Sequence, residues 1–196
     1  MEQSELLAYL IEALDRLHLS YLLTGSVATS YYGEPRFTND IDVIVELTST
    51  DATNFCESFP NDEFYLSTEA VHLAITEQRQ FNIIHPTTGL KIDVFVLNDS
   101  AFEQSRFRRR KKHELEKALL AWFATPEDVI LKKLVYYNEG ESEKHIRDII
   151  GVLKIQGKLI DYAYLSQWAN QLNLSELWQD VLAQSETDQR KTDDAS

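Results

Sequence analysis

The spacing of apolar residues predicts a helix at the start of the chain and short strands after it. Leucine and isoleucine recur every three or four positions between Glu2 and His18, which is typical of an amphipathic helix. The apolar segments 21–25 ("YLLTG") and 40–45 ("DIDVIV") predict two strands, separated by a two-turn helix over 26–33. The chain therefore begins by alternating helices and strands.

The same pattern continues to about position 96. Two short helices are expected over 52–59 and 69–75, and the segment 80–96 ("QFNIIHPTTGLKIDVFV") predicts two strands joined by a turn. The segment 99–123 is ambiguous: its beginning favours a helix, while residues 108–124 fit a hairpin or another helix equally well. Both alternatives stay open at this point.

The second half of the chain predicts helices only. Residues 125–137 ("TPEDVILKKLVYY") start with a capping threonine, a proline at the first helical position and two acids. A further helix is expected from Ser142 to Gly157, and two more carry apolar stripes as far as about position 185. We therefore expect an α+β region over 1–124, a helical subdomain over 125–185, and a disordered polar tail over 186–196.

Composition restricts where the protein works and what it binds. The single cysteine, Cys56, excludes an internal disulfide, and no apolar run reaches the roughly 18 residues that span a bilayer, so we expect a cytoplasmic protein with no membrane partner. The net charge of −13 repels a phosphate backbone on average. Any contact with nucleic acid must therefore be local.

Two carboxylates stand where the pattern predicts a buried strand. Asp40 and Asp42 share one face of that strand, with Cα atoms on the order of 7 Å apart. Their mutual repulsion is relieved by a cation, and oxygen ligands suit Mg²⁺. Asp93 lies on another strand and can bring a third carboxylate, as a two-metal site requires. The alternative is a solvated strand edge.

A glycine-serine turn precedes the acids. Gly25 lets backbone approach a ligand closely, and the helix that starts at Ser26 offers unpaired N–H groups to an anion. Arg36, Lys132 and Lys133 are available to neutralise phosphate charge. Glycine-serine turns are also common in proteins that bind no phosphate.

The basic residues gather in one short stretch. The cluster comprises Arg106, Arg108, Arg109, Arg110, Lys111 and Lys112. In a chain so acidic, it predicts either a solvated surface or a local contact with nucleic acid.

The order of these motifs resembles the nucleotidyltransferase superfamily that shares its fold with DNA polymerase beta. Gly25 and Ser26 are followed by residues 27–39, then by Asp-Ile-Asp in a strand, and later by a third acid in "KIDVFV". The stretch "GEPRFTNDIDV" is similar to the bacterial abortive-infection and toxin–antitoxin branch. That branch carries a lysine-containing helix and a later helix with an aspartate, which "EDVILKKL" and "KHIRDI" resemble.

The resemblance implies a mixed sheet flanked by helices and transfer of a nucleoside monophosphate from a nucleoside triphosphate, for which we expect ATP. Asp40, Asp42 and Asp93 would hold two Mg²⁺ ions, and Asp93 would help to deprotonate the acceptor. Nucleotide binding would involve a further set of residues, namely Gly25, Ser26, Arg36, Lys132 and Asp148.

The acceptor expected from the resemblance is a macromolecule, either tRNA or a cognate toxin or antitoxin protein. A second copy of the chain is a further candidate partner. Two alternatives stay open: a nucleotide-binding antitoxin or interaction module without turnover, and a transferase for small molecules such as aminoglycosides. An acidic protein suits a cationic drug, which is the argument for the second.

Overall fold

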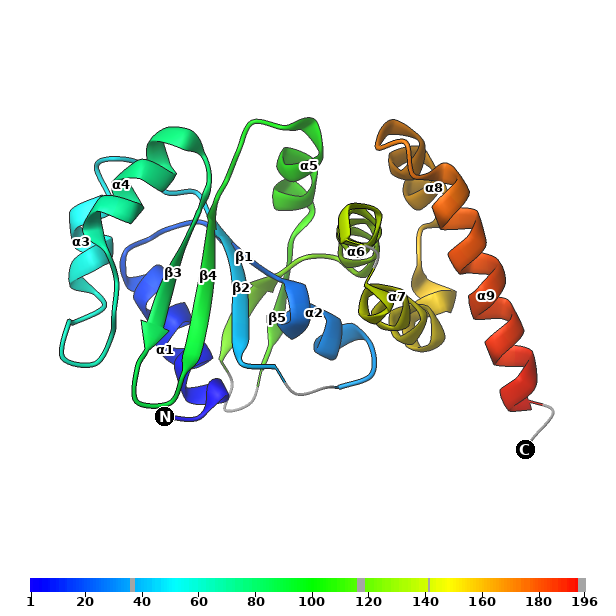
Figure 1. Ribbon diagram of the computed structural model, residues 1–196, viewed down its shortest axis with the longest axis horizontal. Helices are drawn as coiled ribbons and strands as arrows, with labels where there is room; N and C mark the ends of the chain where they lie inside the picture. Colours follow the sequence, from blue (N-terminus) through cyan, green and yellow to red (C-terminus); the bar gives the residue numbers. More distant parts are fainter. Residues whose placement is uncertain (36–37, 116–118, 141, 194–196) are drawn as a thin grey trace. The chain divides into compact units, whose positions relative to one another are not determined.

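The computed structural model describes residues 1–35, 38–115, 119–140 and 142–193, with side chains as far as Thr187 (Figure 1). The chain forms two compact units. Unit 1 comprises Met1–Val27 and Phe37–Ala124, and unit 2 comprises Ala28–Arg36 and Thr125–Ser196. The boundary after Ala124 lies where the sequence pattern changes to helices only, whereas unit 2 also takes a short segment from the first half of the chain.

Unit 1 is built on one mixed sheet of six strands. In chain order the strands are β1 (Tyr21–Thr24), β2 (Asp40–Val45), β3 (Gln80–His85), β4 (Leu90–Val96), β5 (Lys111–Glu114) and β6 (Leu120–Phe123). Their order across the sheet is β3-β4-β2-β1-β6-β5. The β2–β4 and β1–β6 pairs are parallel, and the other neighbouring pairs are antiparallel.

Two of the helices described in unit 1 begin at a serine that caps them. The described helices of this unit are α1 (Gln3–Arg16), α3 (Ala52–Glu57), α4 (Thr68–Glu77) and α5 (Ala101–Arg109). The hydroxyl oxygens of Ser67 and Ser100 accept hydrogen bonds from backbone N–H groups in the first turns of α4 and α5. Helix α1 turns its leucine and isoleucine residues, including the fully buried Leu10, Ile11 and Leu14, into the core.

The ambiguous segment 99–123 forms a helix followed by a hairpin. Helix α5 is followed directly by β5 and β6, which pair antiparallel. Periodicity did not decide between helix and hairpin because β5, at the edge of the sheet, is charged and largely exposed and so lacks the apolar alternation of a buried strand.

Unit 2 consists of helices. They are α6 (Pro126–Gly140), α7 (Glu143–Gln156), the 3₁₀ helix η2 (Gly157–Leu159), α8 (Tyr162–Gln171) and α9 (Ser175–Asp193). Helix α2 (Gly25–Tyr32) starts in unit 1 and ends in unit 2. Helix α9 continues past position 186, where the sequence predicted a disordered tail. None of the described helices is long and apolar enough to cross a membrane.

A buried carboxylate connects α6 with α8. Asp128 is fully buried and accepts hydrogen bonds from the hydroxyls of Thr125, at 2.9 Å, and Tyr164, at 2.7 Å. The neighbouring Glu127 accepts a hydrogen bond of 3.1 Å through Oε1 from the backbone N–H of Asp161, the residue just before α8. The acids at the start of α6 therefore contribute to tertiary structure as well as to the helix start.

This network predicts that Tyr164→Phe lowers the free energy of unfolding by about 2 kcal/mol, because a buried carboxylate loses one charge-assisted hydrogen bond. Urea unfolding followed by circular dichroism measures the change. Tyr65→Phe is the matched control, since Tyr65 is 63% exposed. Equal stability of the two variants would contradict the role given to the Tyr164 hydroxyl.

Candidate functional site

Four polar residues form a row across one face of the sheet in unit 1. The strand registers pair Thr24 with Asp42, Asp42 with Asp93, and Asp93 with Asn82. Directly paired residues of neighbouring strands share a face, so the row runs from β1 through β2 and β4 to β3. Two of the three predicted metal-binding residues, Asp42 and Asp93, are therefore nearest neighbours.

The opposite face of the same strands fixes this arrangement. Ile41 and Val43 of β2 and Ile92 and Val94 of β4 are fully buried. A shift of either strand by one residue would turn these side chains to the polar face and the aspartates into the core. Burial of the apolar face thus keeps the carboxylates in register.

A lysine lies between the first and third acids. Lys91 is paired with Asp40 in the β2–β4 register, two residues before Asp93. Its Nζ atom lies 2.9 Å from Asp93 Oδ2 and 3.6 Å from Asp40 Oδ1. The hydrogen bond to Asp93, together with the charges of Asp93 and Asp40, raises the pKa of the Lys91 ammonium. The protein thus supplies a cation of its own to the acids.

Asp93 is held through both carboxylate oxygens. With its amide group turned toward β4, Asn82 donates from Nδ2 to Asp93 Oδ1 at 2.6 Å, while Oδ2 accepts from Lys91. The Asp93 side chain is 14% exposed and that of Asp40 is 49% exposed. Asp93 is therefore the more rigidly oriented of the two acids that contact Lys91.

Gly25 lies directly against Asp42. A Cβ atom on Gly25 would lie 1.8 Å from Asp42 Oδ2, and the Gly25 φ of +57° is in the left-handed region that favours glycine. The Ser26 N–H, at the start of α2, donates to the same Asp42 oxygen at 3.4 Å. The predicted phosphate-binding turn and the predicted metal ligand are in contact.

Asp42 and Asp93 suit a magnesium ion that is bound together with substrate. Among the residues with defined positions, no group of three or more His, Cys, Asp or Glu side chains is placed to hold a metal ion alone. Mg²⁺ is usually bound by one or two carboxylates plus substrate phosphates, which neighbouring aspartates beside a helix start can provide. The use of Asp40 and of a second ion stays a prediction.

A buried arginine supports the strand that leads into the turn. Arg106 of α5 is fully buried and donates to Thr24 Oγ1 at 2.8 Å and to Glu103 Oε2 at 2.6 Å. Thr24 immediately precedes Gly25. The basic cluster therefore begins with a residue that is neither a solvated charge nor a contact for nucleic acid, contrary to both alternatives considered from the sequence.

Arg110 is also engaged inside unit 1. Its guanidinium carbon lies 4.3 Å from the centre of the Phe107 ring and 5.1 Å from that of Trp122, and burial lowers its pKa. Lys112 also lies over the Trp122 ring, with Nζ 5.6 Å from the ring centre. The well-exposed members of the cluster are Arg108, Lys111 and Lys112.

The other predicted site residues lie in unit 2 or outside the described residues. Asp148 of α7 is buried and accepts from Lys133 Nζ of α6 at 2.6 Å. Lys132, the predicted nucleotide contact, has its Nζ atom 4.9 Å from the centre of the Tyr136 ring, and its role in nucleotide binding stays a prediction. The structure thus pairs the helix aspartate with the second lysine of "LKKL". Arg36 lies outside the described residues.

Comparisons with solved structures show the fold. A crystal structure of an antigenic nucleotidyltransferase-like protein from Paracoccidioides brasiliensis is 21% identical, with a TM-score of 0.50, over 87% of this chain and 90% of that chain. A crystal structure of ANT(2'')-Ia in complex with adenylyl-2''-tobramycin is 14% identical, with a TM-score of 0.56. The match covers 87% of this chain and 98% of that chain. No family model matches the sequence, and neither does any curated protein.

The predicted fold class is confirmed by these two structures: the chain has the mixed sheet and helices of a nucleotidyltransferase fold. At such low identity the likeness concerns the fold alone. Membership of the abortive-infection branch, and the role of each site residue, stay predictions.

The position of Lys91 predicts that it competes with divalent ions. Lys91→Met should raise the affinity for Mn²⁺ alone by about tenfold or more, because the carboxylates lose their internal cation. Electron paramagnetic resonance of free Mn²⁺ measures this without nucleotide. Lys112→Met, at an exposed position of the same unit, is the control. An unchanged Mn²⁺ affinity in Lys91→Met would show that Asp40 and Asp93 do not bind the ion.

Proposed function

We propose that the protein transfers a nucleoside monophosphate from a nucleoside triphosphate, for which ATP is the first candidate, to a hydroxyl group and releases pyrophosphate. The observation that carries the proposal is the contact of the Gly25–Ser26 turn with Asp42, itself the direct neighbour of Asp93. An anion-binding helix start and a pair of carboxylates beside it are what a metal-bound triphosphate requires.

The residues of the candidate site have distinct roles in this proposal. The backbone of Gly25 and Ser26 binds the β- and γ-phosphates, and Asp42 and Asp93, with Asp40 in support, hold Mg²⁺. When bound, Mg²⁺ supplies positive charge to the α-phosphate and the leaving group. The acceptor oxygen bonds to the α-phosphorus as the bond to pyrophosphate breaks, and Asp93 accepts the hydroxyl proton.

In the free protein Asn82 and Lys91 orient Asp93, and Asn82 keeps this role during the reaction. Both donate to its carboxylate, one to each oxygen, and so restrict its rotation. Where Asp40 and Asp93 hold a metal ion, Lys91 would turn from these carboxylates toward the phosphates and add its positive charge there. Positioning and charge carry the reaction, so no nucleophilic side chain is needed.

We propose a macromolecular acceptor, either an RNA end or a hydroxyl on a partner protein. The exposed cations Arg108, Lys111 and Lys112 lie at the end of α5 and on the edge strand β5, and form a local basic surface on an acidic chain. The alternative is a small cationic acceptor. The adenylylated tobramycin in the ANT(2'')-Ia structure and the net charge of −13 favour that alternative.

Single substitutions of the acids test the transfer reaction. Asp42→Asn and Asp93→Asn should lower transfer by about 10³-fold or more, and Asp40→Asn by less, because the Asp40 side chain is 49% exposed, against 14% for that of Asp93. To measure transfer, the protein is incubated with α-labelled nucleoside triphosphates and cell lysate, and the label incorporated into the acceptor and the pyrophosphate released are both determined. Asp62→Asn, at an exposed position, is the control.

Full activity in Asp42→Asn would contradict the proposed site. Nucleotide binding by calorimetry without any pyrophosphate release in the wild-type protein would instead support the non-catalytic module. Absence of nucleotide binding altogether would leave only a role in protein interaction.

The basic surface tests the acceptor. If RNA docks there, replacing Arg108, Lys111 and Lys112 by glutamine should weaken RNA binding and reduce the salt slope by about two to three units. Fluorescence anisotropy with total tRNA at several salt concentrations measures both. The control replaces Arg79 and Lys158, which are exposed elsewhere on the chain. Transfer to an aminoglycoside, with none to RNA or protein, would contradict the macromolecular acceptor but not the transferase.

A further inference from the structure

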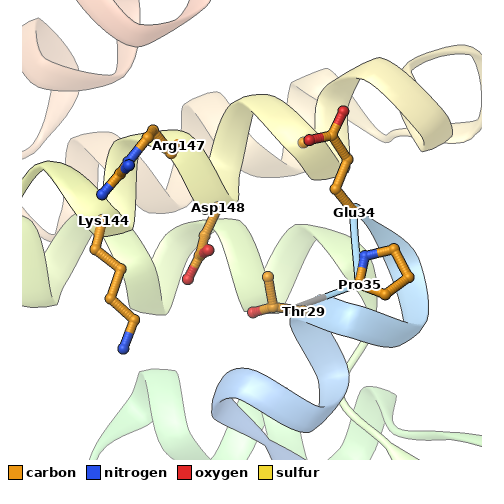
Figure 2. A pocket seen from close by; sticks show the side chains of 7 residues that line it. Thr29, Glu34, Pro35, Lys144, Arg147 and Asp148 are labelled. Atoms are coloured by element: carbon orange, nitrogen blue, oxygen red, sulfur yellow. The ribbon is translucent and has the colours of Figure 1, made fainter. Parts of the chain in front are cut away.

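Unit 2 contains a cavity of about 330 Å³ with residues of its own (Figure 2). Thr29, Glu34, Pro35, Lys144, Arg147, Asp148 and Gly151 line it, and all seven belong to unit 2. Its volume is within the range of small-molecule sites. The cavity shares no lining residue with the polar row of unit 1.

The acidic residues that line the cavity already have cationic partners. Glu34 Oε1 lies 2.9 Å from Lys154 Nζ, and Asp148 Oδ2 lies 2.6 Å from Lys133 Nζ. The second pair is buried, with side chains 6% and 7% exposed, and its charges therefore largely cancel. The negative charge of both acids is compensated within unit 2.

The basic residues of the cavity are in the opposite situation. Lys144 and Arg147 are exposed and make no hydrogen bond or ion pair with any described residue. Lys144 also lies in the first turn of α7, where the helix dipole disfavours a cation. Two uncompensated positive charges therefore line a cavity of a protein whose net charge is −13.

The wall of the cavity opposite these cations is firmly attached to α7. A Cβ atom on Gly33 would lie 3.1 Å from the backbone nitrogen of Val152, so the two backbones approach closely. Gln156 Nε2 donates to the Tyr32 carbonyl at 3.2 Å, and the Lys154–Glu34 pair adds a third connection. The cavity is thus built between two connected segments.

We propose that this cavity binds a phosphate group, with Lys144 and Arg147 as its counter-charges and the Thr29 side chain at its inner wall. Phosphate matches the paired positive charges and the guanidinium fork of arginine. The phosphate can belong to the polyphosphate tail of a nucleotide or to a nucleic-acid backbone. The inference does not rest on the proposed transfer reaction, because neither Lys144 nor Arg147 takes part in it.

Calorimetry with the full chain in the presence of EDTA tests the site. The probes are inorganic tripolyphosphate and a short oligoribonucleotide without terminal phosphates. We expect the wild-type protein to bind at least one of these probes. The double variant, which combines Lys144→Gln with Arg147→Gln, should bind the same probe with at least tenfold lower affinity. Lys158→Gln, which removes an exposed charge of unit 2 outside the cavity, should bind as the wild type does. Circular dichroism checks the fold of each variant.

The two probes separate the sources of phosphate. Binding of tripolyphosphate alone assigns the cavity to a free nucleotide, and binding of the oligoribonucleotide assigns it to a nucleic-acid backbone. Binding of neither, or equal affinity in the double variant, overturns the proposal. Asp42→Asn, which removes a negative charge beside the Gly25–Ser26 turn and leaves the cavity unchanged, should bind tripolyphosphate with the affinity of the wild type. Clearly tighter binding in that variant would place the anion at the Gly25–Ser26 turn and overturn the cavity site only.

Discussion

The parallel pairing of β2 with β4 is the constraint on which the candidate site depends. One register places Asp42 beside Asp93 and Asp40 beside Lys91, and it is fixed by the apolar residues on the opposite face of both strands. A cluster of like charges is unfavourable in a folded protein unless cations offset it. Here burial of apolar residues stabilises the strands, and the Lys91 ammonium offsets part of the repulsion.

The second constraint is the absence of a side chain at Gly25. The Asp42 carboxylate occupies the space that a Cβ atom would need, and the same carboxylate oxygen accepts the N–H of Ser26. The start of α2 and the acidic strand are thereby kept in contact, and Arg106 donates a hydrogen bond to the side chain of the preceding Thr24. An anion at the helix start would lie next to the carboxylates that we propose as ligands of its metal ion.

The sequence predicted the positions of the acids better than it predicted their surroundings. Alternation along "DIDVIV" and "KIDVFV" correctly placed the aspartates on the polar faces of two strands. The same alternation places Lys91 on the face of Asp93, but the neighbour of Lys91 on β2 depends on a register that one sequence does not specify. Arg106 was grouped with solvated cations because its partner Thr24 is distant in the sequence. Hairpin β5–β6 was ambiguous because its edge strand is charged.

The central claim is that the Gly25–Ser26 turn and the Asp42–Asp93 pair form one site for a metal-bound nucleotide. Crystals grown with Mn²⁺ and a non-hydrolysable ATP analogue test it directly, since the anomalous signal of manganese locates the ion independently of activity. The account predicts a manganese peak in contact with both Asp42 and Asp93, with the triphosphate at the N–H groups of Gly25 and Ser26. A nucleotide and metal ion bound at any other place would contradict it.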